Sequence, residues 1–411
     1  MDGRTGDVWI RGGHVIDPAN GIDGLADVLI SEGKIVEVGL DISPPSGAAV
    51  ADVTGKIVTP GLIDMHVHCF ETHMRSKLSL NPIVQTFNCG VTTIVDAGTA
   101  GSRDFPDFKL SIIDKAKIRI LSYVNIVGQG MGSGGLGGAW EHDAWEMRPK
   151  LAAAMAMEYA DVVVGIKTAH YWAMRPFDDQ HLPWTAVDMA VEAGDLCDMP
   201  MMVDFCPWLP ERPYEELILN KMRPGDIHTH VFAKQFPVLD ENGKVNDFMW
   251  KAQKRGIIFD VGHGAGSFWF RNAVPAMAQG FIPDSISTDL HTGNVNGPVI
   301  DQLETMNKIL NIGVSVQDVI AKSTIAPARE IRRPELGTLT VGAEADVAVF
   351  DLVQGDFGFV DCGKERMAGT QRLSCAMTFM RGEPVWNPNG IGLPEWKPGI
   401  RKDPQTGAMM P

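Results

Sequence analysis

The sequence lacks the features of a membrane, secreted or disulfide-bonded protein. No run of about 18 apolar residues is present, so no segment is expected to span a membrane. The first residues, Met1 to Asp7, lack the basic start and apolar stretch of a signal peptide. The six cysteines form no Cys-x-x-Cys pair, which favours free thiols in a reducing compartment. We therefore expect a cytoplasmic protein.

Positive charge is also scarce. The 36 Lys and Arg residues are outnumbered by 51 Asp and Glu, which gives a net charge of −15. This balance disfavours nucleic acid or an anionic membrane as the partner, so a small-molecule substrate is expected. The 411 residues, 45% of them hydrophobic, indicate a globular protein with a substantial core. Dimers are the commonest assembly of soluble proteins, which leaves a homo-oligomer open.

The middle of the chain alternates apolar strands with helical stretches, a pattern typical of parallel β/α units. The strand candidates are 57–65, 91–97, 118–127, 161–167, 199–205, 226–230, 257–261 and 284–289. The helix candidates are 79–89, 144–159, 184–197, 211–222, 246–255, 271–279, 299–311 and 315–323. Eight units over about 270 residues favour a (β/α)8 TIM barrel over a doubly wound open sheet. Short strands at both ends of the chain predict one discontinuous β-domain.

The strand candidate 57–65 is followed by two histidines, His66 and His68. Successive side chains of a strand point to opposite faces, so these two histidines share a face and can bind one metal ion. The same alternation places His228 on one face with His230, where an interior role is expected rather than metal binding.

Polar residues recur at the ends of later strands, where the catalytic groups of a barrel meet. They are Lys167, Asp204, His230, His263 and Asp289. All but the lysine are direct ligands of divalent metals. A desolvated lysine has a depressed pKa, and its free amine can react with carbon dioxide to give a carbamate that bridges two metals. The alternative is a structural lysine that caps a strand.

These motifs together resemble the amidohydrolase superfamily, in its branch of dihydroorotase-like and N-acyl amino acid deacylase-like enzymes. The resemblance covers nearly the whole chain. It is carried by PGLIDMHVH at 60–68, GVTTIVDAG at 90–98, GIK at 165–167, RPGDIHTH at 223–230, DVGHG at 260–264, STDLH at 287–291 and the segment 337–347.

The resemblance implies an α/β fold, a (β/α)8 barrel with a small β-sandwich built from both termini. The expected parts are residues 1–56 and 331–386 for the sandwich, 57–330 for the barrel and 387–411 for an extended tail. It also implies a metal-dependent hydrolase that cleaves a C–N bond of an amide, a cyclic amide or a related ester with a metal-bound hydroxide.

The implied cofactors are one or two divalent metal ions, zinc above all, and carbon dioxide for the carboxylation of Lys167. His66 and His68 would bind the more buried metal, and Lys167 would be the carboxylated bridge. His230 would bind the second metal. Asp289 would bind metal and act as the general base.

One position departs from the family pattern, because Asp204 stands where the fifth strand normally supplies a histidine. Aspartate can ligate zinc, so a binuclear site with Asp204 is expected. The alternatives are loss of the second metal, which leaves a mononuclear enzyme, or an inward-facing Cys206 if the strand ends later.

The substrate contacts predicted from sequence are His170, His263 and His291. No arginine follows Lys167, so binding of an acidic substrate cannot be carried over from the relatives. Two other functions stay open: a mononuclear deaminase of a heterocyclic base, and a catalytically dead barrel that serves as a scaffold.

Overall fold

The structure is a computed structural model in which part of the chain is described. It describes residues 6–71, 77–131, 139–172, 175–204, 210–396, 401–402 and 409–410. Cys206, the alternative ligand at the fifth strand, lies outside these residues, as does part of the tail 387–411. Among the described residues, no helix combines the length and apolarity needed to cross a bilayer.

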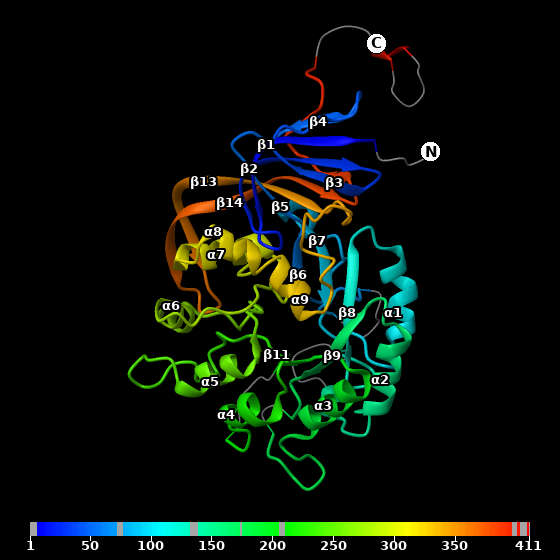
Figure 1. Cartoon of the computed structure of the whole chain (residues 1–411). Helices are drawn as coiled ribbons and strands as arrows, with labels where there is room; N and C mark the ends of the chain where they lie inside the picture. The colour runs from blue at the N-terminus through cyan, green and yellow to red at the C-terminus, as the bar shows by residue number, and fades with distance from the viewer. Residues whose placement is uncertain are drawn as a thin grey trace.

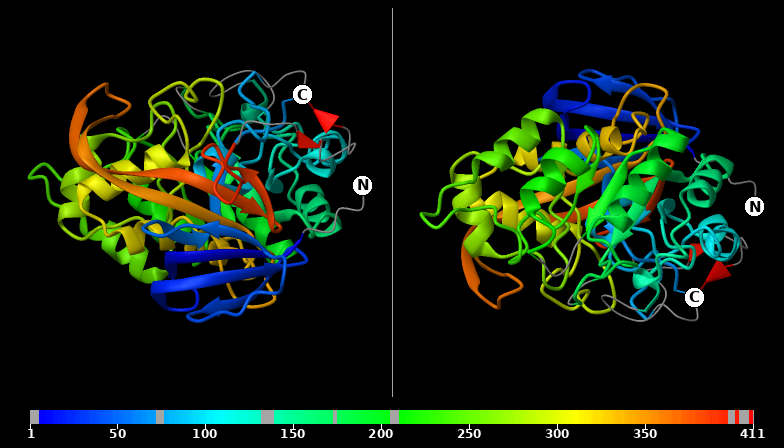
Figure 2. Two further views of the ribbon diagram at one scale, coloured as in Figure 1. Left: turned by 90° about the horizontal axis from the view of Figure 1, so that it is seen from above. Right: turned by 90° about the horizontal axis from the view of Figure 1, so that it is seen from below.

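The two ends of the chain form one mixed sheet of eight strands (Figure 1). Its strands are β1 Val8–Asp17, β2 Ile22–Ser31, β3 Lys34–Gly39, β4 Ala49–Asp52, β5 Ile57–Pro60, β13 Val347–Val360, β14 Arg366–Met380 and β15 Glu383–Trp386. The two ends join where β5 pairs with both β1 and β13. Figure 2 shows these blue and orange strands side by side. The predicted association of both termini is therefore present as a sheet.

A second sheet contains seven parallel strands in chain order, and it is curled. They are β6 Leu62–Val67, β7 Val91–Asp96, β8 Arg119–Asn125, β9 Val163–Ala169, β10 Met201–Asp204, β11 Ile227–His228 and β12 Ile258–Phe259. The eighth strand was expected at 284–289. Segment 285–290 is bridged to Asp260, just after β12, through Ser285, and to Val67 of β6 through Leu290. It therefore lies between the first and the last strand.

Helices follow most of these strands. They are α1 Phe105–Ser111, α2 Pro149–Glu158, α3 Thr185–Cys197, α4 Tyr214–Glu216 with the π-helical turn Leu217–Lys221, α5 Asp247–Arg255, α6 Phe270–Ala278, α7 Gln302–Ile312, α8 Val316–Ala321 and α9 Ile325–Glu330. Short 3-10 helices span Phe87–Cys89, Ile113–Lys115 and Ala139–His142, and a small pair of strands, β16 Arg401–Lys402 and β17 Met409–Met410, lies near the C-terminus.

The helix predicted at 79–89 is wrong, because only the 3-10 turn 87–89 forms there. Asn81 precedes Pro82 and accepts a hydrogen bond from the N–H of Ile83, a local turn that competes with a helix. Helices α1 and α9 were not predicted.

The hydrophobic core leaves the carboxyl ends of the parallel strands to polar residues. Ile63, Val95 and Leu121 pack with Ile325 of α9. The N–H of Ile63 donates to the carbonyl of Ser323, so this cluster lies toward the start of β6.

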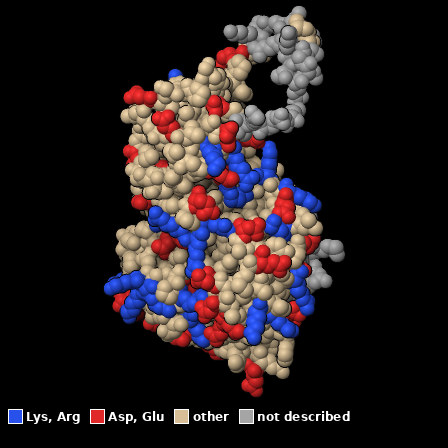
Figure 3. Space-filling view, turned by 45° about the vertical axis from the view of Figure 1, so that its right-hand side comes forward, with Lys and Arg blue, Asp and Glu red and all other residues tan. Residues whose placement is uncertain are grey.

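On the face shown in Figure 3, Lys and Arg side chains are interspersed with Asp and Glu.

The single strand predicted at 57–65 is two strands in different sheets. β5 belongs to the terminal sheet, β6 opens the curled sheet, and Gly61 lies between them. The N–H of Gly61 donates to the carbonyl of Asp346 at 2.8 Å. A Cβ at Gly61 would lie 2.2 Å from Oγ1 of Thr92, so a larger residue here requires that Thr92 or the backbone shift.

We expect Gly61→Ala to destabilise the protein by about 1–3 kcal/mol, because the added methyl group overpacks the site against Thr92. Gly24→Ala is the matched control, since a Cβ at Gly24, also in a strand, meets nothing within 4 Å. The urea midpoints of both variants measure the difference. Equal midpoints would show that the β6–β7 contact can relax.

Candidate metal centre

The six metal ligands predicted from sequence gather at the carboxyl ends of the parallel strands. They are His66 and His68 at the end of β6, Lys167 in β9, Asp204 at the end of β10, His230 after β11, and Asp289 in the segment 285–290. The first five are at most 4% exposed. Strand order thus brings together residues that are more than 200 positions apart in the chain.

Asp289 lies next to His66 and His68, and these three residues form the first cluster. Its Oδ1 lies 3.5 Å from Nε2 of His66 and 3.1 Å from Nε2 of His68. Its Oδ2 lies 4.0 Å from Nε2 of His230. His66, His230 and Asp289 offer ligand atoms that all lie within 4.8 Å of one another. One metal ion can reach such a set.

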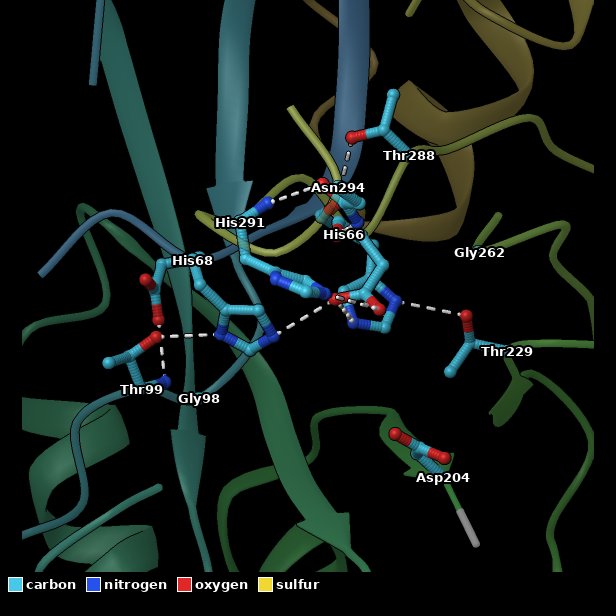
Figure 4. Close-up of polar contacts among 12 residues, drawn as sticks. His66, His68, Gly98, Thr99, Asp204, Thr229, Gly262, Thr288, His291 and Asn294 are labelled. Carbon is cyan, nitrogen blue, oxygen red and sulfur yellow. Dashed lines mark hydrogen bonds and ion pairs between the residues drawn. The ribbon is translucent and has the colours of Figure 1, made fainter. Parts of the chain in front are cut away.

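Nδ1 of His66, His68 and His230 each has a hydrogen-bond partner in the surrounding structure. Figure 4 shows the partners of His66 and His68. Nδ1 of His68 lies 2.8 Å from Oγ1 of Thr99, and Nδ1 of His66 lies 2.9 Å from Oγ1 of Thr229. The hydroxyl of Thr229 donates to Asp260, so it accepts from His66. Nδ1 of His230 donates to the carbonyl of Gly262. With Nδ1 bound in this way, Nε2 is the nitrogen of each ring that would bind a metal ion.

Asp204 forms a second cluster. Its Oδ2 lies 3.1 Å from Nε2 of His230 and 3.5 Å from Nε2 of His170. Burial works against charge on His230, but the Asp204 carboxylate raises the pKa of His230 to about 9. Burial alone would raise the pKa of Asp204, yet His170 and His230 hold this pKa well below its usual range. Without metal, a proton on His230 balances the negative charge of Asp204, as a metal ion would.

Lys167 is fully buried, and its Nζ has no hydrogen-bond partner among the described residues. Burial lowers the pKa of Lys167, although Asp204 and Asp289 oppose that shift. Gly98 makes room for the side chain, since a Cβ there would lie 2.6 Å from Cβ of Lys167. A buried amine with a lowered pKa fits the carboxylated lysine expected from sequence, so the residues present fit a metal centre.

Three residues of the site have left-handed backbone conformations, with φ of 53° for His170, 63° for His230 and 51° for Asp289. Such values are uncommon outside glycine and cluster at functional sites. They also end the strand alternation used for prediction. His228 consequently does not share the site with His230 but packs against Tyr214 and Phe236, where burial lowers its pKa to about 3.

The clusters open into a cavity of about 510 Å³. The site residues that line it are His68, His170, Asp204, His230, Asp289 and His291. His291 lies near the predicted base, with its Nε2 4.0 Å from Oδ2 of Asp289. Met131 and Trp269 add apolar wall. A cavity of this size and mixed lining suits a small organic substrate.

His263, the remaining predicted substrate contact, lies behind the cavity wall. It is fully buried, stacks on Phe268 and has its Nε2 2.9 Å from Nζ of Lys308. Sequence reasoning missed Thr99, although it directly follows a motif of the resemblance. It also missed Thr229, whose signal is its place between two histidines.

The comparisons with known proteins agree with this geometry. A model described as "Amidohydrolase family" matches residues 270–385. A deacetylase of Agrobacterium fabrum is 33% identical over 347 residues, which cover 82% of this chain and 80% of that protein. A deacetylase of Enterococcus faecalis is 32% identical over 384 residues, which cover 92% of this chain and 98% of that protein.

Two solved structures are similar along most of the chain. That of an adenine deaminase has a TM-score of 0.83 and 29% identity, covering 93% of this chain and 100% of the other. That of a dihydroorotase has a TM-score of 0.78 and 28% identity, covering 93% and 98%.

Fold, site and relatives together define a metal-dependent hydrolase that acts on amide-type carbon–nitrogen bonds. The chain belongs to the amidohydrolase family, and the sequence prediction of family and reaction type is confirmed.

We expect Thr99→Val to weaken metal binding by roughly 10–100-fold, because it removes the hydrogen-bond partner of Nδ1 of His68. Thr99→Ser keeps the hydroxyl and should bind metal nearly as tightly as the wild type. Competition with a chelator measures both affinities. Equal affinities for the valine and serine variants would show that the hydroxyl does not orient His68.

Proposed function

We propose that the chain is a binuclear amidohydrolase in which carboxylated Lys167 bridges two metal ions. The first metal position has His66, His68 and Asp289 as ligands. The second has Asp204 and His230. The observation that carries the proposal is the buried amine of Lys167. It has no hydrogen-bond partner among the described residues and lies within electrostatic reach of the carboxylates of both positions.

A second buried lysine shows how unusual Lys167 is. Lys308 is also fully buried, but its Nζ donates to Pro298 at 2.6 Å and lies 2.9 Å from His263. A structural lysine in this protein is thus held by partners. Lys167 has none in the described residues, and this supports a modified amine.

Carboxylation joins the free amine of Lys167 to the carbon of carbon dioxide, and the nitrogen releases one proton. The product is a carbamate with one negative charge and two oxygen ligands. Imidazole, carboxylate and carbamate donors suit zinc, with manganese or iron as alternatives.

The metal ions, when bound, lower the pKa of water and polarise the scissile carbonyl. Asp289 is the general base of the proposed reaction: its carboxylate takes the proton of the attacking water and later delivers it to the leaving nitrogen. Its Oδ2 faces the cavity beside His291, which we propose as a substrate contact. His263, behind the wall, would act on the substrate only through the residues in front of it.

The proposed substrates are amides, including cyclic amides, and related esters. Relatives named deacetylase and dihydroorotase support this class. A mononuclear deaminase of a heterocyclic base is the second candidate, because a solved adenine deaminase has a TM-score of 0.83. The scaffold alternative loses support, since every predicted ligand lies at the site.

We also propose that the chain forms a closed (β/α)8 barrel with a β-sandwich. The proposed parts are 1–56 and 331–386 for the sandwich, 57–330 for the barrel and 387–411 for the tail. The bridges of segment 285–290 to both outer strands support closure. The cytoplasmic location and a homo-oligomeric assembly stay predictions.

The first test is the metal content of protein purified in bicarbonate without chelator. We expect about two divalent ions per chain, measured by plasma mass spectrometry, together with turnover in an amide and cyclic-amide library. About one ion per chain with turnover of amino-purines would instead favour the deaminase. Treatment with a chelator should abolish activity, and added zinc with bicarbonate should restore it.

Lys167→Met keeps the size of the side chain but cannot be carboxylated. We expect loss of one or both metal ions and a fall in kcat/KM of about 10²-fold or more, because the bridge and the charge stabilisation are lost. Lys308→Met is the control for removal of a buried lysine and should keep its metal ions. Full metal content in Lys167→Met would contradict the carbamate bridge.

A further inference from the structure

The second metal position is one imidazole short of the family arrangement. The family pattern expects a histidine at the end of the fifth strand, and β10 ends in Asp204. His230 would then be the only nitrogen donor at this position. Aspartate keeps the number of ligands at this position, but its donor atom is an anionic oxygen rather than an imidazole nitrogen.

His170 lies where this nitrogen is missing. It directly follows β9, three residues after Lys167, and is 3% exposed. β9 and β10 are neighbours, with Ala169 paired to Asp204. The N–H of His170 donates to the carbonyl of Asp204 at 3.0 Å. The φ of 53° then turns the chain so that Nε2 lies 3.5 Å from Oδ2 of Asp204.

The distances around Asp204 repeat those around Asp289. Oδ2 of Asp204 lies 3.1 Å from His230 and 3.5 Å from His170. Oδ1 of Asp289 likewise lies 3.1 Å and 3.5 Å from the two histidines of the His-x-His pair. Ligands about 2.0–2.1 Å from a tetrahedral zinc ion are about 3.3 Å apart, so both sets have the spacing of ligands on one ion.

We infer that His170 is a ligand of the second metal and replaces the histidine that the fifth strand lacks. The inference rests on the proposed binuclear site. It gives this position four ligands, namely His170, His230, Asp204 and carboxylated Lys167. The substrate contact expected from sequence thereby becomes part of the metal centre.

Unpartnered polar atoms support this ligand set. Nζ of Lys167 and Oδ1 of Asp204 are buried and have no hydrogen-bond partner within the described residues. Buried polar atoms of this kind are rare, because leaving them unpaired is costly. Their place in two adjoining side chains beside His170 indicates a ligand at this point rather than a packing defect.

The test compares metal content after loading with Co²⁺ in bicarbonate. The wild type should hold about two ions per chain and His170→Ala about one. His14→Ala is the matched control. It removes one imidazole that pairs with Asp23 in the terminal sheet, and it should keep about two ions.

A second readout uses the wild type alone, so it does not depend on the folding of a variant. In proton NMR of the Co²⁺ protein, each ligating imidazole that keeps an N–H gives one strongly shifted, exchangeable signal. Among the signals that ¹⁵N-labelled histidine identifies as ring N–H, four are expected if His170 binds metal, and three if it does not. This count decides the question if His170→Ala fails to fold.

Two ions in His170→Ala together with three signals in the wild type would overturn the inference and return His170 to the substrate contacts. A wild type that holds only one ion would overturn the binuclear proposal itself. The two failures are therefore distinguishable. One ion in His170→Ala with four signals in the wild type supports the ligand set.

Discussion

Burial of charge at the carboxyl ends of the curled sheet is the constraint on which the rest of the structure depends. Asp204 is 3% exposed, and Lys167 is fully buried close to it. A charge in such surroundings persists only where opposite charge or hydrogen-bond donors face it. Imidazoles therefore crowd around each carboxylate. Without metal, His230 supplies the balancing charge as a proton, which is why its pKa rises to about 9. A metal ion at this place supplies the same balance and leaves the imidazole free as a ligand.

One buried carboxylate outside the predicted ligand set, that of Asp260, links the elements that carry the predicted ligands. Asp260 accepts hydrogen bonds from Thr229, Ser285 and Ser287. Thr229 in turn holds the outer nitrogen of His66, and the two serines belong to the segment that carries Asp289. The Asp260 carboxylate thus links β6, β11 and segment 285–290 next to the predicted metal ligands. The burial that keeps Asp260 dry raises its pKa, and the three hydroxyl donors oppose that shift. The placement of the predicted ligands and the contacts among β6, β11 and segment 285–290 therefore depend on the same hydrogen bonds.

The gathering of the six predicted ligands could be foreseen from sequence, because each stands at the end of an apolar strand and the ends of parallel strands meet in space. The predictions that failed concern local backbone structure. The apolar run 57–65 gave no sign that Gly61 transfers the chain from one sheet to the other, because the switch depends on contacts with Asp346 and Thr92. Strand alternation also misplaced His228, since the positive φ of His230 ends the alternation. Thr99 and Lys308 carry no motif, and only tertiary packing reveals their partners.

The exchange of histidine for Asp204 changes the charge of the second metal position more than its shape. On the proposed ligand set, a nitrogen donor is recovered from His170, so the number and spacing of ligands match those around Asp289. The added carboxylate nevertheless lowers the net charge at this position by one. A less positive centre polarises a carbonyl less strongly and lowers the pKa of water less. The protein then depends more on Asp289 and on contacts such as His291 for activating its substrate.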